Sequence, residues 1–182
     1  MVRRVKKVQI GFDVDGVLYP WHERVYDYMT RNYGFRGTLG QLFVDLNNPR
    51  RYDPGFIKQI VEKKEFYRGE PYKLVVSFLE ELAKDYELHY ITARPLQTSV
   101  ATKAWFKEHK FPYLENVVVV EDSKSKEILE RRIAYYIEDR VKHALELKDL
   151  TNIILVRKPW NEKIQDQFPC MNSILELGNY LK

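Results

Sequence analysis

The sequence holds a single cysteine, Cys170, and no long apolar run. One cysteine cannot form an internal disulfide, so a reducing, cytoplasmic location is expected. No segment is long and apolar enough to cross a bilayer, and the basic residues 1–7 lead into a strand pattern rather than a secretion signal. These absences predict a protein without a membrane partner.

Several familiar site signatures are also missing. The four histidines, His22, His89, His109 and His143, lack metal-ligand spacing. His22 is near enough to the residues at 13–18 to touch a substrate, but a surface role is expected for it. No glycine loop of the Walker or dinucleotide type is present. The run Asp13-Val14-Asp15-Gly16 is not a calcium loop, because its glycine comes too early and the closing acids are absent.

The length and composition favour a single folded domain. The 182 residues are 45% hydrophobic and 14% aromatic, enough for one well-buried core with a small insertion. The net charge of +4 fits an anionic ligand, although 31% charged residues is also an ordinary solvated surface. Nucleic acid is a disfavoured but open partner, since no basic, aromatic-interleaved binding module is visible. The oligomeric state is not indicated.

Strand-like and helix-like patterns alternate along the chain. Continuous apolar runs predict strands buried on both faces at residues 8–12, 88–91, 117–120, 134–137 and 153–156. Helical patterns cover residues 72–84, 96–110, 125–132 and 142–147, with a closing helix over 173–181. This alternation predicts an α/β fold, a three-layer Rossmann-like parallel sheet with helices on both sides.

One long segment interrupts the alternation after the first strand. It contains nearly half of the chain's aromatic residues, together with several prolines and glycines. We expect a small, mostly helical cap at residues 21–85, inserted into a core formed by residues 1–20 and 86–182. Most of these aromatic side chains would form the cap's own core, whereas Tyr19 and Trp21, nearest the acids, would line a pocket for a planar base.

The most informative motif is the acidic pair Asp13 and Asp15 at the end of the first apolar run. Alternate side chains of an extended chain point to one face, so both carboxylates can address one site. Together they can hold a hard divalent cation while one attacks a phosphorus and the other moves protons. Gly16 allows the chain to turn sharply past a bound anion.

The second apolar run is followed by Thr92, Ala93 and Arg94. A hydroxyl and free backbone N–H groups at a strand end suit phosphate oxygens. A turn or helix-cap role is the alternative for Thr92. Arg94 can either contact a phosphate through two N–H groups or form a surface ion pair.

Two lysines, Lys124 and Lys126, follow the third run. A lysine there would offset the repulsion between a nucleophilic aspartate and a phosphate. Lys124 fits the spacing to the next acidic motif better, and Lys126 remains the alternative. Ser123 and Ser125 have the character of helix caps.

Acidic pairs follow both the third and the fourth apolar runs. Glu138 and Asp139 are the preferred completion of a cation site opposite Asp13, because the lysine is expected from the strand before the last acidic motif. The rival pair, residues 121–122, is then expected to be loop or capping residues.

The order of these four motifs resembles that of the haloacid dehalogenase superfamily of phosphotransferases. The resemblance covers roughly residues 5–20 and 86–160. Residues 137–140 (Ile-Glu-Asp-Arg) with 154–161 (Ile-Leu-Val-Arg-Lys-Pro-Trp-Asn) are similar to the 5′(3′)-deoxyribonucleotidase group, in which a Pro-aromatic-Asn turn likewise follows the last strand.

The resemblance implies a mechanism. Asp13 would attack the phosphate and form an aspartyl-phosphate, and Asp15 would protonate the leaving oxygen and then activate water. Mg²⁺ would be held by the Asp13 carboxylate, the Asp15 backbone carbonyl and Asp139, with Glu138 acting through water. Thr92 and the lysine would bind phosphate oxygens. Glu138 is a departure, because many relatives carry aspartate there.

The expected activity is therefore Mg²⁺-dependent hydrolysis of a small phosphate monoester, a (deoxy)nucleoside monophosphate being preferred. The alternatives are a phosphatase for polynucleotide ends or phosphosugars, and a catalytically idle fold that binds a partner through its cap.

Overall fold

The computed structural model describes residues 7–48 and 50–181, built around one six-stranded sheet. The strand order is β3-β2-β1-β4-β5-β6, and every pair is parallel. The strands are β1 (Val8–Phe12), β2 (Tyr86–Thr92), β3 (Val117–Val119), β4 (Tyr135–Glu138), β5 (Asn152–Val156) and β6 (Cys170–Met171). The predicted parallel α/β sheet is confirmed, with β6 as an unpredicted edge strand.

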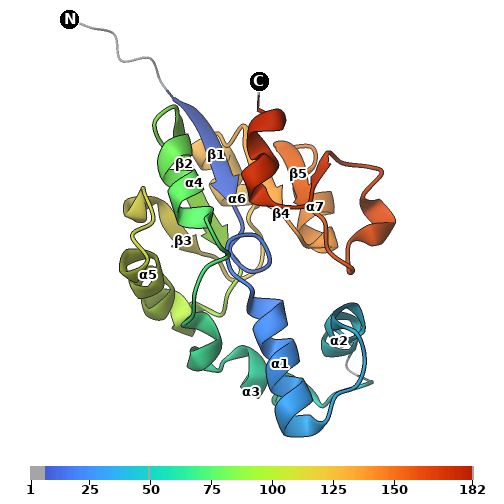
Figure 1. The fold of residues 1–182 in the computed structure, drawn as a ribbon. Helices are drawn as coiled ribbons and strands as arrows, with labels where there is room; N and C mark the ends of the chain where they lie inside the picture. The colour runs from blue at the N-terminus through green and yellow to red at the C-terminus, as the bar shows by residue number, and fades with distance from the viewer. Residues whose placement is uncertain (1–6, 49, 182) are drawn as a thin grey trace, which may run out of the picture.

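Alternation of side chains along β5 shows why helices cover both faces. Ile154 and Val156 belong to a hydrophobic cluster that includes residues of α4 (Val75–Leu82), α5 (Ser99–Glu108) and the 3₁₀ helix η5 (Ile174–Asn179). Ile153 and Leu155 point the other way, into a cluster with α6 (Ser125–Arg131) and α7 (Val141–Leu147). The sheet is therefore the middle of three layers (Figure 1).

Three helices and a 3₁₀ turn follow β1 and lie beyond its carboxyl end (Figure 1). They are α1 (Trp21–Tyr33), α2 (Leu39–Leu46), α3 (Pro54–Val61) and η1 (Lys64–Tyr67). Local sequence sets their ends: α1 stops at Gly34, whose φ of 65° is left-handed, and the Thr38 side chain caps α2. Asp53 caps α3, which begins with a proline.

Helix α4 lies within the range expected for the cap but packs with the sheet. Its residues Val75 and Leu79 join the same cluster as the β1 side chains, and α4 contacts η5. The chain returns from the cap where the Tyr72 N–H donates to the Leu18 carbonyl at 3.0 Å. We propose that the cap ends near Tyr72 and that α4 belongs to the core.

Some predicted helices differ in kind from those in the structure. The helix expected over 96–110 is divided into a 3₁₀ turn, η2 (Leu96–Thr98), and α5. The expected closing helix is the 3₁₀ helix η5, in a segment where Gly178 and Asn179 favour α-helix weakly. Short 3₁₀ turns η3 (Leu114–Asn116) and η4 (Glu162–Ile164) were not predicted. Within the described part of the chain, no helix is long and apolar enough to span a membrane.

Candidate active site

Strand register brings the predicted motifs to one place. Phe12, the last residue of β1, pairs with Tyr90 of β2 and with Ile137 of β4. Asp13 comes next and is fastened by its N–H to the Ile137 carbonyl at 2.9 Å. The end of β2 and the residues after Ile137 therefore flank Asp13, as expected for carboxyl ends in a parallel sheet.

A tight loop after Asp13 turns the chain toward the cap. The N–H groups of Leu18 and Tyr19 both donate to the Val14 carbonyl at 2.9 Å, and the Gly16 N–H donates to the Tyr19 carbonyl at 2.8 Å. Gly16 has a φ of +83°, and a Cβ there would collide with the Asp139 carboxylate. The glycine therefore permits both the turn and the approach of Asp139.

Lys124 is the lysine that reaches Asp13. It is fully buried, and its Nζ lies 2.7 Å from Asp13 Oδ1 and 2.7 Å from Glu138 Oε2. Burial alone would lower the pKa of Lys124, but Asp13 and Glu138 hold that pKa well above its ordinary range. The Lys126 side chain is instead 77% exposed, with its Nζ 3.9 Å from Glu130 Oε1.

The Glu138 carboxylate accepts three hydrogen bonds and keeps a second lone pair on Oε2. Its Oε2 accepts from Lys124, and its Oε1 accepts from the backbone N–H groups of Asp139 and Arg140, each at 3.0 Å. The structure thus places Glu138 mainly as the partner of Lys124. The rival pair, residues 121–122, lies exposed in a loop, as expected.

Three buried carboxylates gather beside Lys124. Oxygen atoms of Asp13, Glu138 and Asp139 all lie within 4.8 Å of one another. Asp139 Oδ1 is buried without a hydrogen-bond partner. Burial, together with Glu138 and Asp13, raises the pKa of Asp139 well above its ordinary value. Hard oxygen donors, excess negative charge and an unpaired buried oxygen fit a divalent cation such as Mg²⁺.

The acidic cluster predicts how the stability of the metal-free protein depends on pH. Burial raises the pKa of Asp13 from 3.8 to about 7, with Lys124 opposing the shift and Glu138 adding to it. Between these two values the folded state holds a proton that the unfolded state has lost. This stabilisation is present below the unfolded pKa and is lost as the pH rises through about 7.

We therefore expect the melting temperature measured in EDTA to fall between mildly acidic and mildly alkaline pH. Thermal melts of the wild type and of Asp13→Asn, followed by circular dichroism across this range, test the expectation. The variant lacks this titration, so its curve should be flatter. Parallel curves for the two proteins would contradict the assignment.

Asp15 is held by Arg94. The Arg94 Nε lies 2.9 Å from Asp15 Oδ2, and its Nη2 lies 2.5 Å from Oδ1. Arg94 is 2% exposed, and the rings of Tyr67, Tyr19 and Trp105 lie 4.9, 5.3 and 5.7 Å from its guanidinium carbon. Arg94 is thus a buried partner of Asp15, so the surface ion pair considered from the sequence is wrong. Arg94 also lines the cleft with Thr92 and Ala93, and its contact with a phosphate stays a prediction.

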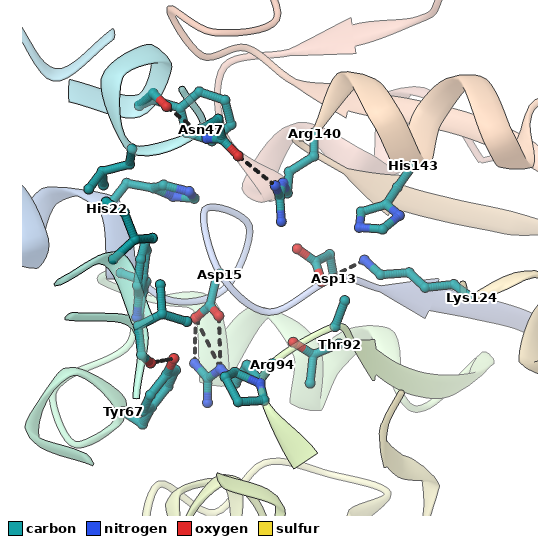
Figure 2. Close-up of a pocket in the computed structure, with 17 residues that line it drawn as sticks. Asp13, Asp15, His22, Asn47, Tyr67, Thr92, Arg94, Lys124, Arg140 and His143 are labelled. Atoms are coloured by element: carbon teal, nitrogen blue, oxygen red, sulfur yellow. Dashed lines mark hydrogen bonds and ion pairs between the residues drawn. The ribbon is translucent and has the colours of Figure 1, made fainter. Parts of the chain in front are cut away.

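Asp13, Asp15 and Arg94 face one cleft of about 750 Å³, part of it open to solvent (Figure 2). Asp13, Thr92, Ala93 and Lys124 line its polar end. The cap contributes apolar and aromatic lining residues, namely Trp21, Phe43, Leu46, Ile57, Val61 and Tyr67, and Asp15, His22, Asn47 and Arg94 add polar groups. Tyr19, expected in the pocket, is absent from the lining and fully buried, with its hydroxyl donating to the Phe66 carbonyl at 2.6 Å.

The prediction of a surface role for His22 is wrong. His22 is 7% exposed, lines the cleft, and packs 4.4 Å from the Trp160 ring. Burial, with Arg140 and Lys158, lowers the pKa of His22 well below its ordinary value, which favours the neutral ring. The periodic apolar residues Trp21, Val25 and Met29 mark the buried face of α1, and His22 lies beside it.

Three further residues of the site were not predicted. Arg140 and His143 line the cleft from the β4–α7 side, and Trp160 Nε1 donates to Asp139 Oδ2 at 3.2 Å. Trp160 belongs to the Pro-aromatic-Asn turn that the sequence singled out without a role. For Arg140, its place directly after the acidic pair was the available signal.

The sheet order and the cluster at the strand ends define a haloacid dehalogenase-like fold. A hydrolase of that family from Streptococcus pneumoniae superposes with a TM-score of 0.67 at 13% identity, covering 97% of this chain and 99% of that one. A provisionally assigned hydrolase of the same superfamily from Bacillus subtilis, whose structure is bound to magnesium, gives 0.64 at 12% identity, covering 97% and 99%.

The chain belongs to the family described as 5′ nucleotidase, deoxy (pyrimidine), cytosolic type C, whose model matches residues 6–173. A Bacillus cereus protein provisionally named a nucleotidase is 30% identical over 118 residues, which are 62% of this chain and 61% of that protein. A provisionally named nucleotidase of Halalkalibacterium halodurans is 32% identical over 85 residues, 46% of this chain and 44% of the relative. The matches therefore span less than two thirds of these curated relatives.

Proposed function

We propose that the protein is a Mg²⁺-dependent phosphomonoesterase that hydrolyses (deoxy)nucleoside monophosphates through an aspartyl-phosphate on Asp13. The observation that carries this proposal is the position of Asp13. Its carboxylate lies against Lys124 and the Asp139 carboxylate, at the polar end of a cleft whose other end is apolar and aromatic. Membership of the nucleotidase family and the names of the relatives support it.

Lys124 would bind a phosphate oxygen, and Asp13 would attack the phosphorus. An ammonium has three donors, and Lys124 uses two of them on Asp13 and Glu138, which leaves one for a phosphate oxygen. Asp13 Oδ1 accepts from Lys124, so the other oxygen, Oδ2, would be the one that attacks phosphorus. Thr92 and the backbone at Ala93 would hold the remaining phosphate oxygens.

Asp15 would move the protons. It would donate one to the leaving oxygen as the Asp13–phosphorus bond forms, and then take one from the water that hydrolyses the aspartyl-phosphate. Arg94 fixes the plane of the Asp15 carboxylate through a bidentate contact. Oδ1 accepts from both Nε and Nη2, whereas Oδ2 accepts from Nε alone, so the second lone pair of Oδ2 would be the site for the proton.

The acidic cluster would hold Mg²⁺ through Asp13, Asp139 and the Asp15 backbone carbonyl, with Glu138 acting through water. When bound there, the ion would supply positive charge to the phosphoryl oxygens. Without it, the pKa values of Asp13 and Asp139 are raised, and Asp13 is a poor nucleophile when it is protonated.

A panel of substrates tests the proposal. Phosphate release would be measured with Mg²⁺ for nucleoside monophosphates, deoxyribose 5-phosphate, an aryl phosphate, phosphosugars and an end-phosphorylated oligonucleotide. We expect kcat/KM for the best mononucleotide to exceed that for deoxyribose 5-phosphate at least about tenfold, because the apolar cleft would bury the base. EDTA should abolish turnover, and added Mg²⁺ should restore it.

Two outcomes would contradict the proposal. Equal kcat/KM for deoxyribose 5-phosphate and the mononucleotides would show that the base is not recognised, and would exclude nucleotide specificity. Absence of phosphate release from the whole panel, by a protein that binds Mg²⁺, would favour a non-catalytic binding protein.

A further inference from the structure

Trp160 lies in a turn after β5 that is tied to the acidic cluster. Its Nε1 donates to the Asp139 carbonyl at 3.1 Å and to Asp139 Oδ2 at 3.2 Å. The neighbouring Asn161 is fully buried, and its Nδ2 donates to the carbonyls of Asp139 and Val156, both at 2.8 Å. The turn therefore holds Asp139 by its backbone and by its side chain.

The two carboxylate oxygens of Asp139 differ in their hydrogen bonding. Oδ2 accepts from the indole N–H, whereas Oδ1 is buried without a partner. A buried carboxylate oxygen without a partner is costly unless a ligand pairs with it. The indole N–H thus holds the carboxylate in the rotation at which Oδ1 can bind a cation.

The face of the same indole packs against the cap. The Phe43 ring of α2 stacks on Trp160 at 4.7 Å with an interplanar angle of 15°, and the His22 ring of α1 lies 4.4 Å away. Helix α2 rests closely on this turn, because a Cβ added at Gly40 would lie 2.9 Å from Pro159 Cβ. One side chain therefore contacts both the cap and a carboxylate of the cluster.

A second contact joins the end of the cap helix α2 to a residue beside the acidic cluster. Arg140 Nη2 lies 3.5 Å from Asn47 Oδ1 at the end of α2, and the two side chains face each other in Figure 2. Arg140 directly follows Asp139 in the chain. The cap helix α2 therefore contacts both the residue after Asp139 and the indole that orients it.

We propose that Trp160 is a positioning residue that couples docking of the cap helix α2 to divalent-cation binding at Asp139. The inference rests on the proposed function in taking Asp139 as a cation ligand. A coupling of this kind is reciprocal: a docked α2 strengthens cation binding, and a bound cation strengthens the docking of α2. The cleft then closes more firmly once the cation is in place.

Three variants separate the parts of this coupling. Trp160→Phe keeps an aromatic face for Phe43 and removes the N–H that Asp139 accepts. Phe43→Leu removes the stacking and changes no residue in contact with a carboxylate of the cluster. Val44→Ala is the matched control, because Val44 lies on the same helix and is 54% exposed.

The first measurement is the dissociation constant of Mn²⁺ for the full chain without substrate, by calorimetry. We expect Trp160→Phe to weaken binding about tenfold, as loss of a partner of a metal ligand typically does. Phe43→Leu should weaken it about threefold through loss of the aromatic pair, and Val44→Ala should leave it unchanged. Wild-type affinity in Phe43→Leu would overturn the coupling.

The second measurement is amide hydrogen exchange in α2 with and without Mn²⁺. In the wild type the metal should slow exchange in α2, and in Trp160→Phe this protection should be lost. Exchange rates in α2 that are the same with and without Mn²⁺ in both proteins would also overturn the inference. Failure of the wild type to bind Mn²⁺ would overturn the cation site and this inference together. Normal, coupled Mn²⁺ binding without phosphatase activity would overturn only the proposed function.

Discussion

Asparagine in place of Asp13 is expected to lower phosphate release by about 10⁴-fold or more, to the limit of detection. The amide has nearly the shape of the carboxylate but cannot attack phosphorus, and it offers a cation one oxygen instead of two. Phosphate release would be measured with the best mononucleotide at saturating Mg²⁺. A variant that keeps more than a tenth of wild-type turnover would exclude Asp13 as the nucleophile.

The asparagine variant should remain folded, which makes the loss of activity interpretable. In the metal-free protein the pKa of Asp13 is raised by burial and by its acidic neighbours, so its ionised form is disfavoured in the folded state. A neutral amide relieves that repulsion. We expect a far-ultraviolet circular dichroism spectrum like that of the wild type and, at alkaline pH, an equal or higher melting temperature.

The second large effect is expected for Lys124→Met, with Lys126→Met as its matched control. Lys124 is fully buried between Asp13 and Glu138, and both carboxylates lose their cation when it is replaced. We expect turnover to fall about 10³-fold, the scale seen when a donor to the transition-state charge is removed. The free energy of unfolding near pH 7 should fall by about 3 kcal/mol, because removing one partner of a buried ion pair is costly.

Lys126→Met should behave like the wild type in both measurements. The Lys126 side chain is 77% exposed, and its Nζ lies 3.9 Å from an exposed glutamate, so the pair contributes little. Turnover would be followed by phosphate release and stability by urea unfolding. If Lys126→Met were the inactive variant, the assignment of the phosphate-binding lysine would be reversed.

The sequence predicted which strand ends meet, but not how each side chain is directed there. Continuous apolar runs located β1 to β5, and the parallel arrangement then brought Asp13, Thr92 and Asp139 to one edge of the sheet. The choice between Lys124 and Lys126 stayed open. The direction of each lysine side chain depends on where helix α6 begins, and the sequence alone does not fix that residue. In the structure α6 begins at Ser125.

The sequence did not reveal the burial of residues whose surroundings come from distant parts of the chain. Arg94 binds Asp15 within a box of rings from Tyr67 of the cap and Trp105 of α5, and no local pattern links these residues. His22 is buried because α2 and the turn after β5 cover it. In both cases tertiary packing decides the role of a side chain whose sequence context is compatible with a surface position.

The central place of β1 in the sheet has a consequence for biosynthesis. Both neighbours of β1 come from much later in the chain, with Val8 paired to Tyr86 and Ile10 paired to Tyr135. While a ribosome makes the protein, this apolar strand therefore has no neighbour until about half of the polypeptide has been made, and its second neighbour is complete only at Glu138. The nascent chain is open to aggregation during that interval, and the acidic cluster of Asp13, Glu138 and Asp139 can assemble only after β4 has been made.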